Sequence, residues 1–143
     1  MIRVVSTMFV MIALSTAIAA DNKDDLKAMQ GTWRPTSGEM AGKALASEGL
    51  KNIKLEIQDD KYTVTAESPD RGTLKLDAGK KPKTMDIAGT EGPNKGKTFL
   101  AIYELSGDTL KICYDLSGKG RPKEFRTTAD SKLFLLTYRR EKP

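Results

Sequence analysis

Short segments in which apolar and polar residues alternate follow one another along most of this chain. The clearest are Ile53–Ile57 (Ile-Lys-Leu-Glu-Ile) and Thr73–Asp77 (Thr-Leu-Lys-Leu-Asp). Successive side chains of a β-strand point to opposite faces of the sheet, so this alternation predicts strands with one buried face. Strands are expected at 32–37, 53–57, 62–64, 73–77, 85–87, 98–105, 110–114, 124–126 and 132–138. About nine short, evenly spaced strands indicate a single all-β domain, either a sandwich or a barrel.

The connections between these segments differ in length in a regular way. Those after the second, fourth and sixth expected strands are tight turns, at 59–60, 78–81 and 106–108. Those after the first, fifth and seventh are longer, at 38–51, 89–97 and 116–123. If antiparallel strands run up and down, alternate connections lie at the same end of the sheet. We therefore expect a closed end and an open end, with any ligand cavity opening among the long loops.

The N-terminus carries the pattern of a signal peptide. Arg3 supplies a positive charge, residues 4–17 are uncharged and mostly apolar, and Ala17-Ile18-Ala19 fits a cleavage site. We expect cleavage after Ala19, export to the periplasm or the cell exterior, and one mature domain at 20–143. An uncleaved anchor is the alternative, although a spanning helix needs about 20 apolar residues.

Charge and composition exclude several classes of protein. The formal net charge is +5, but the basic residues are scattered and do not form the basic face of a nucleic-acid binder. Cys113 is the only cysteine, so no intrachain disulfide can form, and its apolar neighbours predict a buried thiol. There is no histidine, which removes Ser–His and Cys–His nucleophile pairs and every zinc site that contains histidine.

Two patterns suggest chemistry at first sight. The stretch from Gly92 to Thr98 resembles a phosphate-binding P-loop, but its two glycines are one residue too close and a strand follows where a helix is required. Asp86 and Glu104 could serve as an acid–base pair if one of them pointed inward. Alternation, however, places polar residues on the solvent face. We therefore predict no catalytic residues, no metal and no cofactor.

Several longer strings carry a resemblance to a known family. They are 29–33, 60–64, 81–87, 91–98, 102–113, 121–125 and 135–141. On these strings the chain from Leu26 to Glu141 resembles uncharacterised secreted proteins, abundant in planctomycete-type bacteria, whose domain is lipocalin-like. The resemblance implies an antiparallel up-and-down lipocalin-like β-barrel of about eight to nine strands with a short N-terminal helix. It also implies an exported location, and it lends no activity.

One of these strings has a physical meaning in lipocalins. They keep Gly-x-Trp at the start of the first strand, after a short helix that closes the barrel floor, and a basic residue of the last strand lies over the indole. Here Gly31-Thr32-Trp33 follows a segment, 21–30, that begins with capping residues and is expected to form the helix. Arg139 and Arg140 end the last expected strand. We expect a cation–π contact of about 0.5–2 kcal/mol; a generic core tryptophan is the alternative.

The sequence leaves the filling of the barrel open. Phe99, Ala101 and Tyr103 lie on one face of the sixth expected strand, and Leu100 and Ile102 lie on the other. The first face would leave some room and one hydroxyl inside, whereas the second would fill the interior. Small barrels of about eight strands occur in both forms.

The long loops carry the candidate ligand-binding residues. Met40, Leu45 and Leu50 could form a lid, and cationic side chains could surround the mouth. Together with Tyr103 from the interior, the candidates are Lys95, Lys97, Lys119 and Arg121. They predict an exported, monomeric, non-enzymatic module that binds a small apolar or anionic amphiphilic ligand. The alternative is a protein–protein or envelope-associated interaction domain with a filled barrel.

Overall fold

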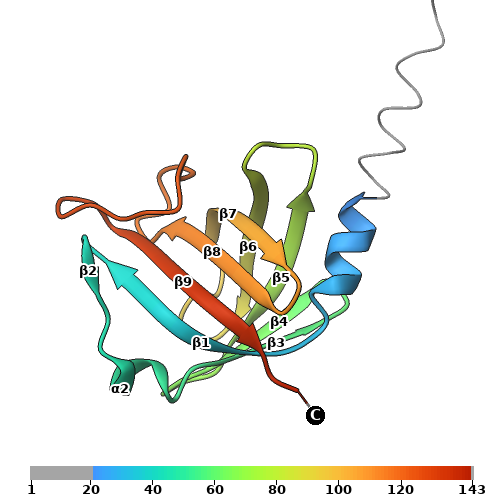
Figure 1. Ribbon diagram of the computed structural model, residues 1–143, viewed down its shortest axis with the longest axis horizontal. Coiled ribbons are helices and arrows are strands. Elements are labelled where there is room, and N and C mark those ends of the chain that lie inside the picture. Colours follow the sequence, from blue (N-terminus) through green and yellow to red (C-terminus); the bar gives the residue numbers. More distant parts are fainter. Residues whose placement is uncertain (1–20, 143) are drawn as a thin grey trace, which may run out of the picture.

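The computed structural model describes residues 21–142, which form one closed β-barrel (Figure 1). Eight of the nine antiparallel strands make the ring, because β1 pairs with both β3 and β9. The remaining strand, β2, forms a short hairpin with the end of β1. A helix at 21–28 precedes the ring. The predicted all-β, up-and-down barrel with a short N-terminal helix is confirmed; the signal peptide predicted at 1–19 lies outside the described residues.

From β3 onward, each strand pairs with the next along the chain. The strands are β1 (Gly31–Met40), β2 (Lys43–Ala44), β3 (Lys54–Gln58), β4 (Lys61–Thr65), β5 (Asp70–Asp77), β6 (Lys83–Glu91), β7 (Thr98–Ser106), β8 (Thr109–Asp115) and β9 (Leu133–Arg140). A single-turn helix, α2 (Ser47–Leu50), lies between β2 and β3.

The strand predicted at 124–126 is wrong. The two strands on either side of it, β8 and β9, pair directly with each other along their length, which leaves no ladder for the segment between them. Residues 116–132 instead cross the outer face of the barrel, where the Arg126 carbonyl oxygen lies 3.9 Å from the Sγ atom of Cys113. Ile102 and Cys113 form an outward-facing pair in the β7–β8 ladder, and both are buried. This cover explains why β7 is apolar on both faces.

The two ends of the barrel differ as the connection lengths predict. The tight connections lie beside the N-terminal helix: the Gln30 side chain donates to the Asp59 carbonyl (2.9 Å), and the Ala78 amide donates to the Asn22 side chain (2.6 Å). The long connections lie at the other end. Figure 1 shows the helix (blue) on one side of the barrel and the 116–132 connection (orange-red) on the other.

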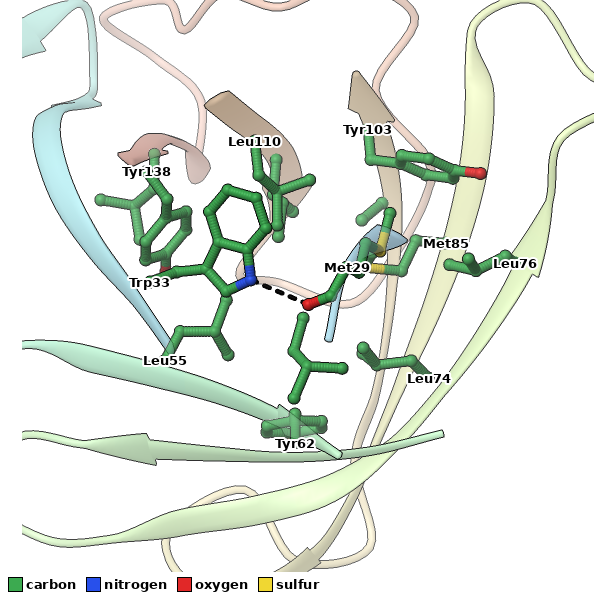
Figure 2. Packing of buried hydrophobic residues seen from close by; sticks show 14 of the residues in the cluster. Met29, Trp33, Leu55, Tyr62, Leu74, Leu76, Met85, Tyr103, Leu110 and Tyr138 are labelled. Carbon is green, nitrogen blue, oxygen red and sulfur yellow. Dashed lines mark hydrogen bonds between the residues drawn. The ribbon is translucent and has the colours of Figure 1, made fainter. Parts of the chain in front are cut away.

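The lone tryptophan closes the barrel at the helix end. Trp33 is completely buried, and its Nε1 atom donates to the Met29 carbonyl oxygen (2.9 Å; Figure 2). Arg140 lies opposite Trp33 in the β1–β9 ladder, so both side chains share one face, and its Cζ atom is 4.3 Å from the ring centroid. Its guanidinium also donates to the Gln30 carbonyl (2.6 Å). The predicted cation–π floor is confirmed, with Arg140 and not the exposed Arg139 as the cation.

Side chains fill the half of the interior next to this floor. The inward face of β7 is the one that carries Ala101 and Tyr103, which answers the question that the sequence left open. The largest completely buried side chains of the core cluster are Trp33, Tyr103, Met29, Met85 and Leu110. The space that remains inside the barrel lies toward the open end.

Candidate functional site

A cavity of about 80 Å³ lies in the open half of the barrel. Strands β3 to β8 supply most of its wall, which is largely apolar: Leu55, Ile57, Val64, Leu74, Ile87 and Ile112. The residues that bring polar groups to it are few: Tyr62, Asp70, Asn94, Tyr114 and Tyr138. An apolar hollow with a small number of polar groups is the usual composition of a site for a small molecule.

Asp70 brings a carboxylate into this apolar wall. It begins β5 and lies opposite Val64 in the β4–β5 ladder, so the two side chains share the inward face. Its Oδ2 atom accepts a hydrogen bond from the Asn94 side chain (2.8 Å). Its Oδ1 atom is buried and has no hydrogen-bond partner among residues 21–142. Leaving a buried acceptor unsatisfied costs about 1–3 kcal/mol, and more for a charged group.

Two glycines allow the loops at the mouth to pack together. A Cβ atom on Gly89 would lie 2.1 Å from the Asn94 carbonyl oxygen, and one on Gly92 would lie 2.3 Å from the Pro69 carbonyl oxygen. Gly92 also has a φ of +89°, which a side chain disfavours. The β6–β7 connection therefore rests against the β4–β5 connection, which brings Asn94 to Asp70.

Aromatic rings surround the same part of the cavity. The ring centroids of Phe99 and Tyr114 are 5.6 Å apart, and Phe134 packs edge-on against Tyr114 at the same distance. Burial, with a contribution from the negative charge of Asp70, raises the pKa of Tyr62 to about 12. The same two causes raise the pKa of Tyr114. Both hydroxyls therefore stay protonated near neutral pH, and both residues line the cavity.

The structure separates the residues that the sequence singled out. Three are exposed on the open-end connections and do not line the cavity: Lys95, Lys97 and Lys119. Arg121 lies on the outer face of the barrel, where its Nη1 atom donates to the Ala101 carbonyl (2.7 Å) and its Nη2 atom lies 2.5 Å from the Asp86 carboxylate. It holds the 116–132 segment against the sheet.

Tyr103, the fifth of these residues, points into the barrel but toward its closed end. Its hydroxyl donates to Asp25 of the N-terminal helix (2.7 Å), and Asp25 also accepts from Lys83 (2.9 Å). Burial and this hydrogen bond raise the pKa of Tyr103. Figure 2 shows Tyr103 and the cavity residue Tyr62 on opposite sides of the core. Tyr103 thus anchors the helix and does not line the cavity.

The residues expected to form a lid occupy other positions. Leu45 and Leu50 pack over Gly38, where a Cβ atom would lie 2.9 Å and 3.3 Å from their methyl groups. They fill the wall beside β1, and neither they nor Met40 lines the cavity. Leu116 does line it, and at 39% exposure it is the one exposed large hydrophobic residue in the described chain.

Sequence reasoning missed Asp70. The alternation of β5 continues upstream from Leu76 and Leu74 through Gly72 to Asp70, which puts this acid in phase with the buried leucines. The strand expected from the sequence began only at residue 73. An acid in the inward phase of a strand was the available signal.

The acids that the sequence did consider lie outside the barrel. Asp86 pairs with Arg121 on the outer face, and Glu104 is exposed. Within residues 21–142, no group of three or more His, Cys, Asp or Glu side chains is placed to hold a metal ion. In the same range, no helix has the length and apolar character needed to cross a membrane.

Comparison with known proteins leaves the site to be interpreted from its own geometry. No protein-family model, no curated protein and no solved structure matches the chain.

Proposed function

We propose that this protein is an exported, non-enzymatic member of the lipocalin-like family it resembles, and that it binds one small, mainly apolar ligand inside its barrel. Export is supported by the signal-peptide pattern of residues 1–19. Binding is supported by one observation, the apolar cavity in the open half of the barrel. Apolar surface removed from water contributes about 25 cal/mol per Å², so burial in this cavity supplies the affinity.

The volume of the cavity limits the ligand. Drug-sized molecules occupy pockets of about 300–1,000 Å³, and an apolar cavity of about 150 Å³ holds benzene. At about 80 Å³, the cavity suits a short branched chain as it stands. A ring fits if Leu116 or Asn94 at the mouth moves outward.

A second candidate function has support in the other half of the molecule. Fully buried side chains occupy the barrel interior near Trp33, and the cavity above them is about 80 Å³. These features favour a protein–protein or envelope-associated domain that acts through its loops. Such a domain needs no small molecule in its interior.

Native mass spectrometry of protein purified from its own host distinguishes the two functions. Val64→Phe adds bulk to the cavity wall, and Thr63→Phe makes the same addition to the opposite face of β4. A small-molecule adduct in the wild type and in Thr63→Phe, absent from Val64→Phe, supports binding in the cavity. Overpacking costs about 1–3 kcal/mol, so thermal unfolding confirms that Val64→Phe is folded. Wild-type protein free of adduct in repeated preparations favours the interaction domain.

A further inference from the structure

Among residues 21–142, the carboxylate of Asp70 has no positively charged partner. An ionised carboxylate only accepts hydrogen bonds, and within these residues Asp70 receives one, at Oδ2 from Asn94. In the described part of the chain, no Lys or Arg nitrogen lies within 4.0 Å of it. Its neighbour Arg71 points to the outer face and pairs with Glu91 (3.1 Å). A carboxylate in apolar surroundings requires a partner that donates hydrogen bonds and, best, carries positive charge.

The rings beside this carboxylate favour a cation as well. Phe99 and Tyr114 line the cavity, and Tyr62 lines it from β4. The face of an aromatic ring is electronegative and attracts an ammonium group within about 6 Å. Aromatic rings combined with a carboxylate are the surroundings in which proteins bind organic ammonium ions.

From these surroundings we infer, building on the binding function proposed above, that the ligand is a small amine. Its ammonium group donates to the carboxylate of Asp70, which lines the cavity, and its apolar body lies against the wall formed by Val64, Ile87 and Ile112. An anionic head group would instead meet the negative charge of Asp70 at the mouth. The site therefore selects against the anionic amphiphile that the loop lysines predict.

The loop lysines oppose this selectivity only weakly. Lys95, Lys97 and Lys119 are exposed and do not line the cavity. Exposed charges are screened over about 8 Å at physiological ionic strength, whereas partly buried charges such as the half-buried Asp70 are screened much less. The charge of Asp70, and not that of the loop lysines, therefore sets the preference for an amine over an anion.

Three matched probes test the inference: isobutylamine, isobutanol and 3-methylbutanoate share the isobutyl group and differ in the head group. Binding at pH 7 is followed through amide chemical shifts of the full mature chain. The wild type is expected to bind the amine at least about tenfold more tightly than the alcohol, because hydrogen bonds to charged groups are the stronger ones. The anion 3-methylbutanoate is expected to bind most weakly.

Two variants test whether the preference for the amine depends on the charge of Asp70. Asp70→Asn keeps the size of the side chain and an oxygen that can accept from Asn94, and it is expected to remove the preference for the amine. Glu67→Gln removes the same charge from an exposed position in the neighbouring connection and is expected to leave the preference intact. The amide spectrum of each variant reports whether it is folded.

The outcomes separate the inference from the binding function. Equal binding of alcohol and amine by the wild type overturns the amine inference, and so does a folded Asp70→Asn variant that keeps the preference. Absence of amine binding also overturns it. In each case the adduct measured on protein from the native host decides independently whether the binding function stands.

Discussion

The closed and the open end of this barrel are made from the same eight strands, but they treat their polar groups differently. At the closed end, Trp33 donates to Met29, Tyr103 donates to Asp25, and Arg140 covers the indole. At the open end, a buried oxygen of Asp70 has no partner in the described chain, and the cavity lies beside it. The polar groups of the closed end are paired within the fold, whereas the open end leaves one buried acceptor unpaired among residues 21–142.

The interaction energies at the two ends differ in the same direction as their hydrogen bonding. The Trp33–Met29 hydrogen bond adds about 0.5–1.5 kcal/mol and the Tyr103–Asp25 bond, to a carboxylate, about 1.5–3 kcal/mol. Both join the N-terminal segment to the barrel. At the open end, side chains around the cavity lack dispersion contacts that a packed core would give them. Folds tolerate local departures from complete packing and pairing mainly where function requires them.

Titration of the four tyrosines tests how well both ends of the barrel exclude water. Of the experiments predicted, it is expected to give the largest loss of stability. Burial raises the pKa of Tyr62 from its ordinary 10.0 to about 12, and it raises the pKa of Tyr103, Tyr114 and Tyr138 as well. The folded state therefore keeps protons that the unfolded chain loses near pH 10. The resulting stability is complete below that pH and is lost as the pH rises through about 12. We expect cooperative alkaline unfolding.

Near-ultraviolet absorbance of tyrosinate and circular dichroism should change together in this titration. These four residues are all the tyrosines of the chain. If the absorbance showed some of them ionising near pH 10 in a folded barrel, the open end would be more accessible to water than the structure indicates.

Removing the indole should be the most damaging single substitution at the closed end. Trp33→Ala leaves a large void and deletes the surface on which Arg140 lies, so a loss of about 3–5 kcal/mol is expected. Denaturant unfolding of the barrel, produced as residues 20–143, measures it. A folded variant of unchanged stability would contradict the role assigned to the floor.

The indole floor of the closed end was predictable because its sequence signals are local, whereas the Tyr103–Asp25 hydrogen bond, between residues 78 positions apart, was not. Strand alternation and turn length depend on neighbouring residues, and Gly31-Thr32-Trp33 stands next to the helix it follows. Which arginine covers the indole required the β1–β9 register, since Arg139 and Arg140 are equivalent in the sequence until that register places Arg140 opposite Trp33.

The site at the open end was less predictable, because its residues contact partners that are far away in the sequence. Arg121 lies in a long loop that suggested the cavity mouth, yet it binds Asp86, 35 positions earlier in the chain. The short apolar segment around Phe125 suggested a strand, but Phe125 lies on the outer face near the Lys111 amine. Asp70 alone was within reach of sequence reasoning, through its phase with Leu74.

The two arginines at the end of β9 allow the contribution of the indole contact to stability to be measured with single substitutions. Arg140→Ala removes the cation–π contact and the hydrogen bond to Gln30, and a loss of about 2 kcal/mol is expected. Arg139→Ala, at the exposed neighbouring position, should change stability by less than about 0.5 kcal/mol. Equal effects in denaturant unfolding would mean that the floor needs only positive charge and not contact with the indole.

The smallest effect is expected from Leu116→Ala at the cavity mouth, with Leu110→Ala as its counterpart in the packed half. Leu110 is completely buried, so its truncation should cost about 2–5 kcal/mol. Leu116 is 39% exposed and borders existing space, so its truncation should cost less than about 0.5 kcal/mol. The same truncation should weaken ligand binding, because Leu116 contributes apolar surface at the mouth. Unfolding and isobutylamine titration of both variants give a direct test: if Leu116→Ala destabilises the fold as strongly as Leu110→Ala, the mouth belongs to the core and not to a binding site.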